Sequence, residues 1–278
     1  MTVEALCTAP VMPGRRATNL AILGDSTAVG LGDPLPAGGW RGFGPLLAAA
    51  LGTTGELQYT NLAFTGARMA SLRHRQLPDA LAQRPDVVVI LAGMNDTLRS
   101  DFDPEAVHDD LDATVSALQG GGAVVLTARF HEHERVFRLP GPLRRALHDR
   151  VEQLNDAIAR VVTRRGTPCL DLHLMPGTYD LAAWSVDRLH PSERGHRMLA
   201  DGFATLLADV GITVPNPVDL ACSGGRELTI AHHIAWLVCQ GVPWLGRRGR
   251  DFLPHAAAVV LRDVFGRSAA VPSRCVRR

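Results

Sequence analysis

Residues 20–32 read LAILGDSTAVGLG, and this stretch determines the kind of fold that we expect. Its first five residues form a short apolar run that predicts a buried β-strand. The run ends at Gly24-Asp25-Ser26, and small residues and glycines follow. A strand that ends in such a turn can lead into a phosphate-binding loop, a plain helix cap or the seat of a nucleophilic serine.

Similar apolar runs recur along the chain, and segments with helical periodicity separate them. Strands are predicted at 20–24, 58–63, 87–93, 123–128 and 168–173, and helices at 42–51, 71–83, 104–118, 142–165 and 193–208. Strands that are apolar throughout and alternate with amphipathic helices are typical of a parallel sheet covered on both faces. We therefore expect an α/β fold with a doubly wound sheet that binds ligands at the carboxyl ends of its strands.

The sequence pattern changes near residue 211, where GITVPNPVDLACSGGRE brings two prolines and three glycines. This composition predicts a boundary, with one domain over 1–210 and an extension over 211–278. The extension has apolar residues at helical spacing, and its last 53 residues hold nine arginines against three acids. We expect a helical, arginine-rich extension. It is either a solvated helix docked on the main domain or a weak contact site for an anionic partner or a membrane surface.

The composition excludes several classes of function. The net charge is +1, so no overall field favours nucleic acid, and no nucleic-acid partner is expected. All 29 basic residues are arginine, which rules out Schiff-base chemistry on a lysine and a P-loop lysine. The longest apolar runs fall short of the ~20 residues that a transmembrane helix needs. The five cysteines are scattered, and no signal peptide is evident, so a cytoplasmic protein with free thiols is predicted.

The glycines after the first strand fit neither common phosphate-binding motif. Five residues separate Gly24 from Gly30, and Leu31 stands where a P-loop has lysine. A dinucleotide fingerprint fails as well, because Asp33-Pro34 interrupts the glycine spacing after Gly30-Leu31-Gly32. A helix cap by Asp25 or Ser26 is still compatible with the turn.

Three other segments favour the nucleophilic serine. Gly66 follows the second strand, where a residue without a side chain lets its N–H approach a ligand. Asn95 supplies an uncharged amide donor at the end of the third strand. Asp187 and His190 are three residues apart, so that the carboxylate can reach the imidazole.

These residues supply the parts of serine ester chemistry. Ser26 is the predicted nucleophile, His190 its base and Asp187 the acid that orients the imidazole. The N–H groups of Ser26 and Gly66 and the side chain of Asn95 would stabilise the oxyanion, at ~3 kcal/mol for each donor removed.

The four blocks Gly-Asp-Ser, Gly, Gly-x-Asn-Asp and Asp-x-x-His, in this order over residues 18–208, closely resemble the SGNH (GDSL-like) hydrolase family. The resemblance implies a flavodoxin-like three-layer α/β/α sandwich, no metal or organic cofactor, and roles for Ser26, Gly66, Asn95, Asp187 and His190 as above. Thr27 stands at the fourth position of the family's GDSL block. The function implied is hydrolysis of a small-molecule ester through an acyl-enzyme, and the oligomeric state stays open.

Two alternatives remain. An acyltransferase, or a deacylase of a specialised metabolite, would use the same residues, and a non-catalytic binding protein would use the fold with a silent site. Other residues are given supporting places: Asp25 as a helix cap, Asp96 as a brace of its own loop, and Trp40 and Arg41 as a substrate rim. His131 and His133 are placed in a polar loop at the sheet edge, because H-x-H without a third ligand is a weak metal motif.

Overall fold

A computed structural model describes residues 14–52, 55–136 and 141–223 of the 278-residue chain. Its centre is a five-stranded parallel sheet with the strand order β2-β1-β3-β4-β5. The strands are β1 (Asn19–Gly24), β2 (Gln58–Asn61), β3 (Val87–Leu91), β4 (Val124–Arg129) and β5 (Cys169–Asp171). This is the flavodoxin-like order, in which the chain reverses direction across the sheet between β1 and β3.

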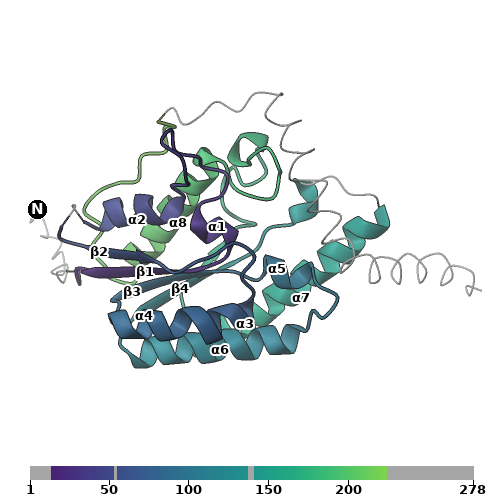
Figure 1. Ribbon diagram of the computed structural model, residues 1–278, viewed down its shortest axis with the longest axis horizontal. Helices are drawn as coiled ribbons and strands as arrows, with labels where there is room; N and C mark the ends of the chain where they lie inside the picture. The colour runs from purple at the N-terminus through teal and green to yellow at the C-terminus, as the bar shows by residue number, and fades with distance from the viewer. Residues whose placement is uncertain (1–13, 53–54, 137–140, 224–278) are drawn as a thin grey trace, which may run out of the picture.

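Helices cover both faces of the sheet (Figure 1). One layer holds α1 (Ser26–Val29), α2 (Phe43–Leu51) and α8 (Glu193–Asp209). The other holds α3 (Met69–Ser71), the π-helix η1 (Leu72–Gln76), α4 (Leu77–Gln83), α6 (Pro104–Gly120) and α7 (Gly141–Arg165). Three short helices lie in the connections: α5 (Met94–Thr97), and the 3₁₀ turns η2 (His133–Arg135) and η3 (Leu181–Ala183). The fold is thus the expected three-layer α/β/α sandwich.

The central strands β1 and β3 coincide with apolar runs of the sequence because their side chains are buried. Every residue of β1 and β3 is buried, which agrees with strands covered on both faces. The edge strand β2, with the sequence QYTN, is half-exposed and ends two residues earlier than predicted. The helix predicted at 71–83 is divided in the structure, because a π-helical turn over Leu72–Gln76 interrupts it. The interruption places the Gln76 amide against Gly24, the last residue of β1.

The chain beyond residue 210 begins as part of the main body. Ile212 is buried in the core, and the Thr213 N–H donates to the Arg15 carbonyl. Asn216 bonds the carbonyls of Ala49 and Ala50 at the end of α2. Residues 211–223 therefore pack on the sandwich. The rest of the helical extension predicted over 211–278 lies outside the described residues.

Candidate active site

The candidate active site lies at the carboxyl edge of the sheet, where the strand order reverses. Ser26 opens α1 directly after β1, and Asn95 lies in α5 directly after β3. Since β1 and β3 are hydrogen-bonded neighbours, both residues reach the same edge. Crevices at such a reversal are the usual ligand sites of open parallel sheets.

The turn that presents Ser26 is held from both sides. The Asp25 carboxylate caps α1 by accepting a 3.0 Å hydrogen bond from the Thr27 N–H. The buried Gln76 amide accepts from the Gly24 N–H at 2.8 Å and donates to the Gly24 carbonyl at 2.9 Å. Gly24 has φ of 157°, and a Cβ there would lie 2.3 Å from the Leu91 carbonyl oxygen. Only glycine fits this close contact with β3.

His190 connects Ser26 with Asp187. Its Nε2 lies 2.7 Å from Ser26 Oγ, and its Nδ1 lies 2.6 Å from Asp187 Oδ2. The other carboxylate oxygen of Asp187 accepts from the N–H groups of Leu189 and His190 and from Ser185 Oγ, all at 2.9 Å. Burial alone raises the pKa of Asp187, but its bonds with His190 and the two backbone N–H groups lower the pKa overall. Asp187 is therefore a carboxylate that holds the imidazole in place.

Asn95 and Gly66 line the same pocket as Ser26. Asn95 Nδ2 donates to the Ala67 carbonyl at 3.1 Å and makes a long contact of 3.4 Å with Asp25 Oδ2. These contacts orient the amide between the turn after β1 and the loop after β2. Burial raises the pKa of Asp25 to about 6, against the lowering effect of its Thr27 hydrogen bond and of His190.

Asp96 braces the loop after β2. Its two carboxylate oxygens accept from Arg68 Nε at 3.2 Å and from the Met69 N–H at 3.1 Å. Burial raises the pKa of this carboxyl, although Met69 and Arg68 lower it in part. The contacts bind the loop that carries Gly66 to the loop that carries Asn95.

A cavity of about 370 Å³ opens beside Ser26 and His190. Most of its wall is apolar, with contributions from Met94, Leu98, Phe130, Met175, Trp184 and Met198. A mostly apolar cavity with a few convergent polar groups is the usual form of a small-molecule site. The arrangement can bind an apolar group and present its polar end to Ser26.

His131 and His133 are part of this cavity wall, which corrects their expected place in a polar loop. Both are buried, their rings lie 3.0 Å apart from Nδ1 of His133 to Nε2 of His131, and His131 packs on Trp184. Burial lowers the pKa of His133 to about 4 and that of His131 well below its usual range, so both are neutral near pH 7. Their position directly after β4 was the available sequence signal, because the carboxyl ends of all parallel strands meet at one edge.

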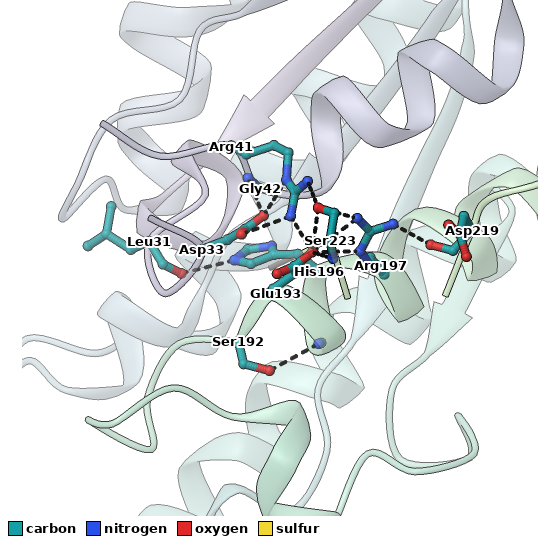
Figure 2. Close-up of polar contacts among 11 residues, drawn as sticks. Leu31, Asp33, Arg41, Gly42, Ser192, Glu193, His196, Arg197, Asp219 and Ser223 are labelled. Carbon is teal, nitrogen blue, oxygen red and sulfur yellow. Dashed lines mark hydrogen bonds and ion pairs between the residues drawn. The ribbon is translucent and has the colours of Figure 1, made fainter. Parts of the chain in front are cut away.

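Trp40 and Arg41 do not line the cavity. Trp40 is 46% exposed, and Arg41 is bound to Asp33 and Glu193 in a polar network (Figure 2). His173, another residue near a strand end, bonds the Tyr179 hydroxyl instead. His196 is fully buried in α8, where its Nε2 donates to the Leu31 carbonyl at 2.9 Å.

Among the residues that the structure describes, no group of three or more His, Cys, Asp or Glu side chains could hold a metal ion. No helix in these ranges combines the length and the apolar character needed to span a bilayer. Cys169 and Cys222 are free thiols, and Cys222 is exposed.

Comparisons with known proteins identify a similar sequence family and similar folds. The sequence pattern of the GDSL-like Lipase/Acylhydrolase family matches residues 22–198, and no curated protein matches the chain. A structure of an alpha/beta hydrolase enzyme from the metagenome of Lake Arreo, Spain, is 24% identical over 69% of this chain and 95% of its own, with a TM-score of 0.55.

Two further structures have the same fold. The lipase/acylhydrolase from Enterococcus faecalis is 20% identical over 69% of this chain and 96% of its own, with a TM-score of 0.54. The acetylxylan esterase Axe2 from Geobacillus stearothermophilus is 20% identical over 77% of this chain and all of its own, with a TM-score of 0.55. At these identities the likeness establishes the fold.

Proposed function

Because this chain belongs to the GDSL-like Lipase/Acylhydrolase family, we propose that it is a serine esterase that cleaves carboxylic esters through an acyl-enzyme. The observation that carries the proposal is the continuous line of contacts from Asp187 through His190 to Ser26, at 2.6 Å and 2.7 Å. This is the geometry that an activated serine requires, with a base within hydrogen-bond reach and a third group that orients the base.

In the first step Ser26 Oγ attacks the ester carbonyl carbon while His190 Nε2 accepts the hydroxyl proton. The negative charge moves to the former carbonyl oxygen, and Asp187 stabilises the imidazolium without taking its proton. When the tetrahedral intermediate collapses, the bond to the alcohol oxygen breaks, and His190 returns the proton to the departing alcohol. The acyl group is then bound to Ser26.

Three groups would stabilise the oxyanion: the N–H groups of Ser26 and Gly66 and the amide of Asn95. Ser26 stands at the first turn of α1, where backbone N–H groups lack partners within the helix. The Asn95 amide is held before any substrate binds by its 3.1 Å bond to the Ala67 carbonyl, and its second N–H, in a long 3.4 Å contact with Asp25, would turn to the oxyanion. Donors oriented in advance lower the barrier because they need no rearrangement as the charge develops.

In the second step water attacks the acyl-enzyme, and His190 accepts the water proton at Nε2. Collapse of the second tetrahedral intermediate breaks the bond to Ser26, and the proton returns to Ser26 Oγ. The products are the carboxylic acid and the free enzyme, so each turnover consumes one ester and one water. An acyltransferase or a metabolite deacylase would differ only in the attacking acceptor or in the acylated group.

The apolar cavity beside Ser26 favours an ester with an apolar acyl or alcohol group. The neutral state of His131 and His133 near pH 7 adds no charge to this wall. We therefore expect no preference for a charged group at this wall.

The test is hydrolysis of p-nitrophenyl acetate, butyrate and octanoate, an acetylated sugar and a thioester by the wild type and by Ser26→Ala. We expect hydrolysis by the wild type, loss of activity in Ser26→Ala and an unchanged circular dichroism spectrum. Labelling of Ser26 by a fluorophosphonate separates an active serine from a silent binding site. Full activity in Ser26→Ala would disprove the mechanism, and transfer to an added alcohol in preference to water would identify an acyltransferase.

A further inference from the structure

A network of buried charges lies beside the candidate active site, between α8 and the loop after α1 (Figure 2). The Asp33 carboxylate binds Arg41 through two bonds, from Nε at 2.9 Å and from Nη2 at 3.1 Å. Arg41 Nη2 also lies 2.8 Å from Glu193 Oε1, and Arg197 Nε donates to the same oxygen at 3.0 Å. The Glu193 carboxylate on α8 thus binds two guanidinium groups, that of Arg41 from the loop after α1 and that of Arg197 from α8 itself.

These charges are largely withdrawn from water. The side chains of Asp33 and Arg197 are 2% and 6% exposed, and those of Glu193 and Arg41 are 12% and 19% exposed. Burial raises the pKa of Glu193, but hydrogen bonds from the Ser223 N–H and from Arg41 outweigh it and lower the pKa to about 2. The network therefore stays charged at neutral pH. Loss of Arg41 would leave the buried Asp33 without its ion-pair partner, whereas Glu193 would keep Arg197.

The network joins the two segments that determine the distance between nucleophile and base. Asp33 and Arg41 belong to the loop that follows Ser26, and Glu193 follows His190 by three residues. Between them the backbones touch, since a Cβ at Gly32, with φ of 97°, would lie 2.0 Å from the Pro191 carbonyl oxygen. The contact leaves no space for a side chain at Gly32. Since Pro191 follows His190 directly, a shift of the loop at this contact would change the distance between Ser26 and His190.

Residues that lie beyond the family match complete the network. The Ser223 N–H donates to Glu193 Oε1 at 2.6 Å, and Ser223 Oγ accepts from Arg41 at 3.0 Å and from Arg197 at 2.9 Å. Arg197 also donates to the Asp219 carbonyl. The match ends at residue 198, so this part of the network lies outside it.

We propose that Arg41 and Glu193 are positioning residues for ester hydrolysis. Their ion pair, which Ser223 bridges, holds the loop after Ser26 against the helix after His190. The proposal rests on the proposed function. A displacement of the reacting groups by about 1 Å can lower a rate ~100-fold. Loss of the pair therefore lowers the chemical rate, whereas substrate binding in the cavity, which neither residue lines, is retained.

The test compares the full-length variants Arg41→Gln and Glu193→Gln with the wild type. We expect kcat to fall about 10- to 100-fold with KM within about two-fold, because the lost contacts affect the geometry of reaction more than substrate binding. The rate of Ser26 labelling by a fluorophosphonate falls by a similar factor. Ser223→Ala, which keeps the backbone donor to Glu193, gives a smaller loss of about three-fold.

The matched control is Arg165→Gln, which removes an arginine bound through two contacts to Asp112 on the far layer. It leaves kcat and the labelling rate within about two-fold of the wild type, because this pair joins α6 to α7 and neither residue lines the cavity. The double variant Arg41→Gln/Glu193→Gln loses less activity than the product of the two single losses, because the two residues share one contact.

Folded variants with a lower midpoint of thermal unfolding but wild-type kcat and labelling rate would overturn the proposal and leave a structural role alone. If Arg41→Gln does not fold, Glu193→Gln and Arg41→Lys provide the same comparison. A wild type that neither hydrolyses esters nor labels at Ser26 would overturn the proposed function and this proposal together. Wild-type activity with unaffected variants overturns only the positioning role.

Discussion

His190 Nε2 lies 2.7 Å from Ser26 Oγ, although 164 positions separate the two residues in the chain. Ser26 belongs to the turn after β1, and His190 to the loop before α8. The contact therefore depends on how α8 and the loop before it pack within the layer that also holds α1 and α2.

Asp187→Asn should lower kcat about 10⁴-fold with little change in KM, because an amide facing Nδ1 stabilises the wrong imidazole tautomer. Steady-state hydrolysis of p-nitrophenyl butyrate measures the effect. Asp180→Asn, an exposed carboxylate in the same connection, is the control. An Asp187→Asn enzyme with near wild-type kcat would show that His190 needs no carboxylate.

Asn95→Ala should lower kcat by about 10²- to 10³-fold and leave KM nearly unchanged, as expected for one lost oxyanion donor. The amide is oriented by Ala67 and Asp25 and is not needed for the fold of β3, so the variant should remain folded. Kinetics and circular dichroism together measure this. If KM rises instead while kcat is kept, Asn95 binds the ground state and is no oxyanion donor.

Asp25→Asn should change how stability depends on pH. The pKa of Asp25 is raised from 3.8 to about 6 on folding, so its contribution to stability is present below pH 3.8 and is lost as the pH rises through 6. The Asp25→Asn variant has no carboxyl group at this position and therefore does not lose stability in this way as the pH rises. Its free energy of unfolding relative to the wild type should therefore increase by up to about 3 kcal/mol between pH 4 and pH 7.

Urea denaturation at several pH values measures this difference. The Asp25→Asn variant should also be less active, because Asn95 loses the carboxylate that lies 3.4 Å from its Nδ2. A difference in stability that is constant with pH would contradict the raised pKa.

The buried histidines should destabilise the protein in acid. Burial lowers the pKa values of His133 and His196 from 6.5 to about 4, so their contribution is complete above pH 6.5 and is lost as the pH falls through 4. Each accounts for up to about 3 kcal/mol of unfolding free energy, and Asp25 acts with the opposite sign. We expect a net loss of stability between pH 6.5 and pH 4.

His133→Phe tests this, since it keeps an aromatic ring against Trp184 without a titratable group. The variant should lose less stability than the wild type over the same pH range. His74→Phe removes an exposed imidazole and is the control. Equal losses for the wild type and His133→Phe would show that His133 does not titrate on unfolding in this range.

Gln76→Leu should lower the free energy of unfolding by about 2–4 kcal/mol, because it leaves the N–H and the carbonyl of Gly24 without their buried partner. Activity should fall as well, since Gly24 begins the turn that presents Ser26. Chemical denaturation and kinetics measure the two effects. A loss below about 1 kcal/mol would mean that water replaces the amide at this position.

Local sequence was sufficient for much of the architecture. The apolar runs at 20–24 and 87–93 predicted β1 and β3 because both strands are covered on both faces. Five helices begin within two residues of their predicted starts, except that the segment at 71–83 contains a π-helical turn. That turn could not be read from periodicity, because it places Gln76 against a backbone 52 positions away.

The order of the short motifs predicted which residues meet at the sheet edge, since parallel strands all end at that edge. The sequence predicts Arg41 at a substrate rim and His131 in a polar loop, whereas Arg41 lies in an ion-pair network and His131 lines the cavity. Burial, the partners of charged groups and the position of Ser223 over α8 depend on contacts between segments far apart in the chain. The sequence by itself determined the strands, the helices and the chemical groups, because these follow from local patterns. Only the tertiary structure decided which charges are buried together, because that depends on how distant segments pack.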